Sequence, residues 1–193
     1  MRYASMRNLD ISNGENIGVS LFVQGCHFHC NNCFNSETWD FEGGYSWTEK
    51  SIKDFLNLIN RSYIKRVSIL GGEPLTSRNV EEIFHLISTI RKLFPTKTIW
   101  LYTGFTWEQI MNPTNSDDIL RKEIVSQCDV VVDGEYIDEL RDITLKWRGS
   151  SNQRVIDVKK ALKKVRWFYG RINYRSVRRW IRCVTCGVCR SSP

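Results

Sequence analysis

Short apolar segments alternate with amphipathic segments along the first 133 residues. Apolar runs typical of strands lie at residues 19–24, 66–70, 98–102 and 129–132. Between them, apolar residues recur at helical spacing over residues 50–60 and 79–94. Shorter helices are expected at residues 107–111 and 117–126. Strands that alternate with helices predict a parallel sheet with helices packed outside it. Polar residues or glycines follow each strand, and this carboxyl edge is where such folds place their sites.

Three cysteines follow the first predicted strand. Cys26, Cys30 and Cys33 have the spacing C-x3-C-x2-C. Thiolates are the usual ligands of iron–sulfur clusters, and a cubane normally takes four of them, so three would leave one iron open to a small chelating ligand. The alternative is a zinc site completed by His27 or His29. Zinc motifs usually bring a second pair of cysteines, and the core of the chain offers no such pair.

A glycine turn follows the second predicted strand. Gly71 and Gly72 precede Glu73 and Pro74 there. Glycines at a strand end let the backbone approach a ligand closely, and carbonyl groups there can accept hydrogen bonds from an ammonium group. Alone, the turn would say little. Combined with a three-cysteine loop upstream, it resembles the radical S-adenosylmethionine superfamily, whose members bind the amino group of this cofactor at such a turn.

Within that superfamily the chain resembles the activating proteins of anaerobic ribonucleoside-triphosphate reductase, a family that activates glycyl-radical enzymes. The resemblance runs from about residue 10 to residue 153, with matching stretches at residues 21–26, 33–39, 71–74, 99–104, 132–136 and 147–153. It implies an oxidoreductase with a 4Fe-4S cluster on Cys26, Cys30 and Cys33. It also implies contacts to S-adenosylmethionine from Asn32, Cys33, Phe34, Gly71, Gly72 and Glu73.

One position departs from the wider superfamily. The residue before the third cysteine is often aromatic there, and it is Asn32 in this chain. We therefore expect either that Phe34 stacks on the adenine of the cofactor in place of this aromatic residue, or that the stacking is weaker than in the wider superfamily.

The resemblance also implies the reaction and its partners. One electron cleaves S-adenosylmethionine, and the resulting radical takes a hydrogen atom from a glycine of the reductase, with flavodoxin or ferredoxin as the electron donor. Full barrels of this type need about 250 residues. A body of residues 1–153 is therefore expected to form a partial β/α barrel, whose gap a protein substrate could fill.

The basic charge is concentrated at the carboxyl end. Residues 1–153 carry 16 Lys and Arg against 20 Asp and Glu, whereas residues 154–193 carry 12 against one. We therefore expect a catalytic domain over residues 1–153 and a basic extension over residues 154–193, with an amphipathic helix at residues 157–169. Such an extension could bind an acidic protein surface or nucleic acid.

The extension ends in three further cysteines, Cys183, Cys186 and Cys189. Their C-x2-C-x2-C spacing is similar to a ferredoxin run that lacks its fourth cysteine and its proline. Three interpretations stay open: ligands of a second metal centre, a basic docking arm, or an extension without metal.

Single residues near the predicted active edge also have alternative interpretations. Asp133 could bind a ribose hydroxyl or the partner, but an Asp-Gly turn is favoured. Arg148 could pair with the cofactor carboxylate, with an acidic group of the partner, or in a surface ion pair. Cys128 precedes a strand and is expected in the core.

No run of the sequence approaches the roughly 18 apolar residues that span a bilayer, and the first residues lack the apolar centre of a secretory signal. We therefore expect a cytoplasmic protein with no membrane contact, in which seven cysteines serve metals or catalysis rather than disulfides. Two rival functions remain: a radical S-adenosylmethionine enzyme for a small molecule such as a deazapurine precursor, and a zinc-dependent nucleic-acid-binding module.

Overall fold

A computed structural model of the chain describes residues 1–168. Residues Met1–Lys159 form one compact unit, and a second unit begins at Lys160. The three cysteines of the carboxyl-terminal extension, Cys183, Cys186 and Cys189, lie outside the described residues.

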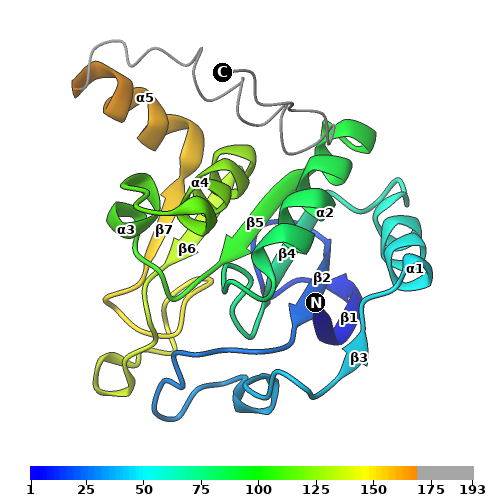
Figure 1. The fold of residues 1–193 in the computed structure, drawn as a ribbon, viewed down its shortest axis with the longest axis horizontal. Helices are drawn as coiled ribbons and strands as arrows, with labels where there is room; N and C mark the ends of the chain where they lie inside the picture. Colours follow the sequence, from blue (N-terminus) through cyan, green and yellow to red (C-terminus); the bar gives the residue numbers. More distant parts are fainter. Residues whose placement is uncertain (169–193) are drawn as a thin grey trace, which may run out of the picture. The chain divides into compact units, whose positions relative to one another are not determined.

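The centre of the fold is a seven-stranded sheet with the order β3-β1-β2-β4-β5-β6-β7 (Figure 1). Its four middle strands are parallel: β2 (Gly18–Val23), β4 (Arg66–Gly71), β5 (Thr98–Tyr102) and β6 (Val130–Asp133). The flanking strands are antiparallel to their neighbours: β1 (Arg2–Asp10), β3 (Tyr45–Ser46) and β7 (Arg154–Asp157). The predicted α/β class is confirmed. The sheet is not closed, and the partial barrel stays a prediction.

Helices connect the parallel strands. They are α1 (Glu49–Ile59), α2 (Val80–Leu93), α3 (Trp107–Met111) and α4 (Ser116–Gln127), with α5 (Val158–Phe168) after β7 and short 3-10 turns η1 (Ser36–Thr38) and η2 (Asp138–Leu140). Thr48 and Ser51 form a capping box that starts α1, and Thr106 and Gln109 form another at α3. Because strand-to-strand crossovers are right-handed and the strand order is sequential, the connecting helices collect on one face of the sheet.

The two faces of the sheet differ in character. Side chains alternate between the faces of a strand, and those on the helix-covered face are completely buried aliphatic groups: Val19, Leu21, Val23, Val67, Ile69, Ile99, Leu101 and Val131. The opposite face carries side chains that are polar or aromatic, among them Ser20, Ser68, Trp100 and Tyr102. Loops lie against this second face: the hydroxyl of Ser68 donates to the carbonyl of Asn13, and the ring of Trp147 packs on that of Trp100.

A buried ion pair holds the loop between β1 and β2 against this second face. The guanidinium of Arg66 and the carboxylate of Asp10 are both fully buried and lie 3.1 Å apart. Arg66 also donates to the carbonyl groups of Asn13 and Glu15, and Asp10 accepts from the backbone amides of Ser12 and Asn13. The network fixes residues 10–15 beside the polar face of the sheet.

The sequence did not predict the three antiparallel strands. β1 and β7 are edge-proximal and largely exposed, so neither has the alternation of apolar and polar residues that marks a half-buried strand. β3 consists of only two residues, both exposed. The four parallel strands were predicted because burial on both faces leaves nearly continuous apolar runs.

Candidate active site

The three cysteines lie in a loop that leaves the carboxyl end of β2 and returns beside it. The amides of Gly25 and Cys26 donate to the carbonyl groups of Thr38 and Trp39, at 2.8 and 3.1 Å. His29 and Asn32 adopt left-handed backbone conformations, with φ of 50° and 52°, one residue before Cys30 and Cys33. These turns let a short loop place successive cysteines along one pocket.

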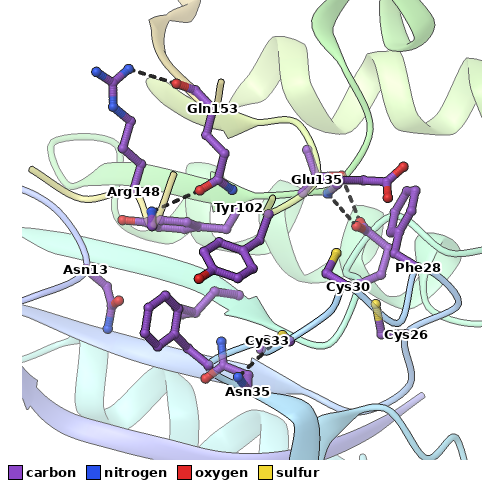
Figure 2. Close-up of a pocket in the computed structure, with 18 of the residues that line it drawn as sticks. Asn13, Cys26, Phe28, Cys30, Cys33, Asn35, Tyr102, Glu135, Arg148 and Gln153 are labelled. Atoms are coloured by element: carbon purple, nitrogen blue, oxygen red, sulfur yellow. Dashed lines mark hydrogen bonds between the residues drawn. The ribbon is translucent and has the colours of Figure 1, made fainter. Parts of the chain in front are cut away.

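All three cysteines line a single cavity of about 510 Å³ on the polar face of the sheet. Figure 2 shows Cys26, Cys30 and Cys33 on one side of this pocket and Asn13 and Arg148 on the other. Burial raises the pKa of the Cys26 thiol to about 11 and also raises the pKa of Cys30. Binding of a metal centre, which takes thiolates, would therefore release protons.

The glycine turn after β4 packs directly on the start of the cysteine loop. The amide of Gly72 donates to the carbonyl of Val23 at 2.9 Å, and the amide of Glu73 donates to that of Gly25 at 2.8 Å. A methyl group at Gly72 would lie 2.5 Å from the carbonyl oxygen of Gly25. The structure thus brings together the two motifs that the sequence singled out, and it leaves no space for a side chain between them.

Glu73 is almost completely buried beneath this turn. Its carboxylate accepts hydrogen bonds from the amides of Leu75 and Gly104 and from the hydroxyl of Thr103, each at 2.8 Å. Burial raises the pKa of Glu73 to about 7, although these donors oppose the shift. The side chain ties the ends of β4 and β5 together. In the described structure its side chain therefore positions the turn.

Asn32 connects the cysteine loop to the segment that follows β6. Its side-chain amide donates to Oδ2 of Asp138 at 2.6 Å, and the hydroxyl of Tyr136 donates to Oδ1 of the same carboxylate at 2.5 Å. The ring of Phe34 lies 5.2 Å from that of Tyr136, and the Arg141 guanidinium lies over Phe34 at 5.2 Å. Sequence reasoning missed this link because its residues are far apart in the chain and carry no periodic pattern.

The stretch at residues 147–153 forms a loop beside the pocket. The side chain of Gln153 accepts from the amides of Gly149 and Ser150 and donates to the carbonyl of Gly134. Arg148 lines the pocket and donates to the carbonyl of Gln153 at 2.7 Å. Gln153 thereby holds this loop against the end of β6.

Asp133, at the end of β6, is buried and has a role within the fold. Its carboxylate accepts from the amide of Trp107 at the start of α3, at 2.7 Å, and forms an ion pair with Arg154 of β7. The sequence suggested a turn here, and Gly134 does follow with φ of 94°. The partner Arg154 was not foreseen because a single arginine after a loop has no distinguishing pattern.

The remaining candidates lie at the edges of the site or in the core. His27 and His29 are exposed, and His29 packs edge-on against Trp39 with the ring centroids 4.8 Å apart. Cys128 is buried in the core. Within residues 1–168, no group of three or more His, Cys, Asp and Glu side chains is arranged to hold a single metal ion.

The donor set fits an iron–sulfur cluster. Three thiols open into one cavity, and the backbone amide of Asn35 already donates to Sγ of Cys33 at 3.4 Å, the kind of contact that tunes cluster potentials. The adjoining glycine turn contributes backbone rather than side chains to the same region.

Comparison with known proteins decides the family. Residues 12–156 match the family model described as a 4Fe-4S single cluster domain. The chain is 37% identical over 155 residues to the anaerobic ribonucleoside-triphosphate reductase-activating protein of Enterobacteria phage T4, a match that covers 80% of this chain and 93% of the relative. The chain belongs to the family of anaerobic ribonucleoside-triphosphate reductase-activating proteins.

Other relatives in this family agree. The activating protein of Escherichia coli K12 is 36% identical over 157 residues, covering 80% of this chain and 97% of the relative, and that of Pasteurella multocida is 33% identical over 155 residues, covering 79% and 95%. The family that the sequence motifs resembled is thus confirmed. The family model ends at residue 156, so most of the basic extension lies beyond the part that it matches.

Proposed function

We propose that this activating protein is a radical S-adenosylmethionine enzyme whose substrate is the anaerobic ribonucleoside-triphosphate reductase. The observation that carries the proposal is the packing of the Gly72 turn on the loop of Cys26, Cys30 and Cys33, with all four residues on one pocket. The names of the relatives support the reductase as the partner.

In this proposal each part of the site has a task. The thiolates of Cys26, Cys30 and Cys33 hold a 4Fe-4S cluster, and the backbone of Gly71, Gly72 and Glu73 receives the methionine end of S-adenosylmethionine. A reduced cluster held there would supply the one electron needed to cleave S-adenosylmethionine, and a glycine of the reductase would be the source of the hydrogen atom removed in the reaction.

The remaining residues orient the cofactor and shield the reaction. Asn32 has no ring for the adenine to stack on, and its side chain instead holds the loop to Asp138. Phe34 is 57% exposed and lies at the pocket, where its ring can stack on the adenine. The docked reductase then covers the pocket and excludes water during the reaction.

The cellular setting follows from the same proposal. Flavodoxin or ferredoxin delivers the electron, and the protein works in the cytoplasm. No helix among residues 1–168 has the length and apolar character needed to cross a membrane.

Anaerobic reconstitution with iron and sulfide tests the proposal. We expect a broad visible absorption that bleaches on reduction, 5′-deoxyadenosine formed from S-adenosylmethionine, and a glycyl radical signal once a competent reductase is added. Cys26→Ala should lose the formation of 5′-deoxyadenosine, whereas Cys128→Ala, which changes a buried thiol outside the pocket, should keep it.

Other outcomes would favour the rival functions. A colourless zinc protein that binds nucleic acid would refute the proposal. Cofactor cleavage without any glycyl radical on the reductase would favour a small-molecule substrate, such as a deazapurine precursor.

A second metal centre at Cys183, Cys186 and Cys189 remains a prediction, alongside the docking-arm interpretation. Deleting residues 183–193 and counting iron per reconstituted chain tests it. A fall in the iron count supports the second centre, and an unchanged count removes it.

A further inference from the structure

Two buried polar atoms mark the pocket as a polar binding site. Among the described residues, the buried side-chain atoms without a hydrogen-bond partner are Nε1 of Trp39 and the hydroxyl of Tyr102. Both residues line the same cavity as the cysteines. Buried polar groups are nearly always paired, and an unpaired one is costly, so a pair of them on one cavity points to a ligand that completes them.

The two atoms belong to different parts of the pocket. Trp39 is in the cysteine loop, where its carbonyl accepts from the amide of Cys26 at 3.1 Å. Tyr102 is the last residue of β5, and its side chain lies on the sheet face opposite the aliphatic helix-covered face. Figure 2 shows Tyr102 between the cysteines on one side and Asn13 on the other, with its hydroxyl directed away from Cys30.

The surroundings of Tyr102 are fixed by contacts that are independent of the cysteine loop. Asn13 is held by its hydrogen bonds to Asp10, and its carbonyl accepts from Arg66. Arg148 is held by the carbonyl of Gln153. These side chains form a prepared polar region on the part of the pocket away from the cysteines.

The chemistry of the hydroxyl limits what can bind there. Burial raises the pKa of Tyr102, so the phenol stays protonated and can both donate and accept a hydrogen bond. A peptide group offers one acceptor and one donor and can match it. The reacting residue of the reductase segment is a glycine, which has no side chain. At this residue the pocket can therefore recognise only the main chain.

We propose that Tyr102 binds the protein substrate: its hydroxyl hydrogen bonds to a main-chain peptide group of the glycine-bearing segment, in the region lined by Asn13 and Arg148. This inference rests on the proposed function and adds to it a substrate-binding residue and a region of the pocket distinct from the cysteine end.

The test compares Tyr102→Phe with Tyr45→Phe, which removes a phenol from a side chain that is 66% exposed and lies outside the pocket. Affinity for a synthetic peptide with the sequence of the glycine-bearing segment of the reductase is measured on the reconstituted protein without reductant. Affinity for S-adenosylmethionine and the melting temperature are measured on the same samples. No turnover is needed for any of these readouts.

We expect Tyr102→Phe to weaken peptide binding roughly five- to tenfold, the size of one lost hydrogen bond. The melting temperature should not fall, since the variant removes a hydroxyl that has no partner in the protein. Tyr45→Phe should change neither value.

Three results would overturn the inference. Equal peptide affinity in Tyr102→Phe and the unaltered protein would show that the hydroxyl does not contact the segment. An equal or larger loss of affinity for S-adenosylmethionine would make Tyr102 a cofactor ligand instead. A clear fall in melting temperature would mean that the hydroxyl has a partner in the free protein. Failure of the proposed function is distinct from all three, because the unaltered protein would then form no glycyl radical on the reductase.

Discussion

The hydroxyl of Thr103 donates a 2.8 Å hydrogen bond to the buried carboxylate of Glu73, which joins the end of β5 to the glycine turn after β4. Both residues are nearly inaccessible to solvent. The contact therefore helps to fix the turn that we assign to cofactor binding, and its strength depends on the charge of Glu73.

Thr103→Val should lower the free energy of unfolding by about 1–3 kcal/mol at pH 8, the usual cost of a lost bond to a buried charged group. Because the pKa of Glu73 is raised to about 7, the carboxyl is mostly neutral at pH 5 and the loss should be smaller there. Urea denaturation at both pH values measures this. The exposed Thr98→Val on the same strand is the control, and equal losses of Thr103→Val at the two pH values would contradict the expectation.

The glycine turn itself gives the second prediction. Gly72→Ala places a methyl group 2.5 Å from the carbonyl oxygen of Gly25, and neither backbone can move without shifting the cysteine loop. We expect a loss of about 1–3 kcal/mol in unfolding free energy, typical of overpacking, together with less iron bound after reconstitution. Gly43→Ala is the control, because its methyl would come within 3 Å of a side chain alone, the amide of Gln24 at 2.6 Å, and would lie at the ordinary contact distance of 3.5 Å from the backbone oxygen of Asp40. Normal iron content in Gly72→Ala would contradict the close packing of the two motifs.

The sequence predicted the parts of this site that have local patterns. Aliphatic runs marked β2, β4, β5 and β6, and because parallel strands end at one edge, the cysteine loop and the Gly72 turn were expected to meet. The charged pair of Arg66 and Asp10 was not predicted, because a charged residue at the start of a strand normally lies in solvent. The pair is buried because the loop after β1 folds back over it, and no local sequence pattern reveals this fold of the loop.

The link from the cysteine loop to the segment after β6 was equally hidden. Asn32 and Asp138 are 106 positions apart, and each is a common turn residue. Their contact exists only because β2 and β6 end at the same edge of the sheet.

This link gives the third prediction. Asp138→Ala removes the acceptor for both Asn32 and Tyr136, so the cysteine loop should open locally more often while global stability changes little. Iron release from the reconstituted protein to a chelator should become roughly two- to tenfold faster. Asp54→Ala, which removes an exposed partner of Lys50 on α1, should leave the rate unchanged. An unaltered rate in Asp138→Ala would mean that the link does not restrain the loop.

The buried pair of Asp10 and Arg66 gives the last prediction. Burial would raise the pKa of Asp10, but hydrogen bonds from Asn13, Ser20 and Arg66 outweigh it and lower the pKa to about 2. A carboxyl whose folded pKa lies below its unfolded value stabilises the protein fully above the unfolded value of about 3.9. This stabilisation is lost as the pH falls through about 2.

Asp10→Asn should also lose stability at neutral pH, since it leaves the guanidinium of Arg66 buried without a charged partner. Removing one member of a buried pair costs about 3–5 kcal/mol, whereas replacing both by apolar groups is often neutral. Arg66 also donates to the carbonyl groups of Asn13 and Glu15, and these bonds are kept in Asp10→Asn but lost in the double variant Asp10→Leu with Arg66→Met. The double variant should therefore be less stable than Asp10→Asn. Urea denaturation at pH 7 measures both variants. If Asp10→Asn were as stable as the unaltered protein, the ion pair would not be what holds residues 10–15 on the polar face of the sheet.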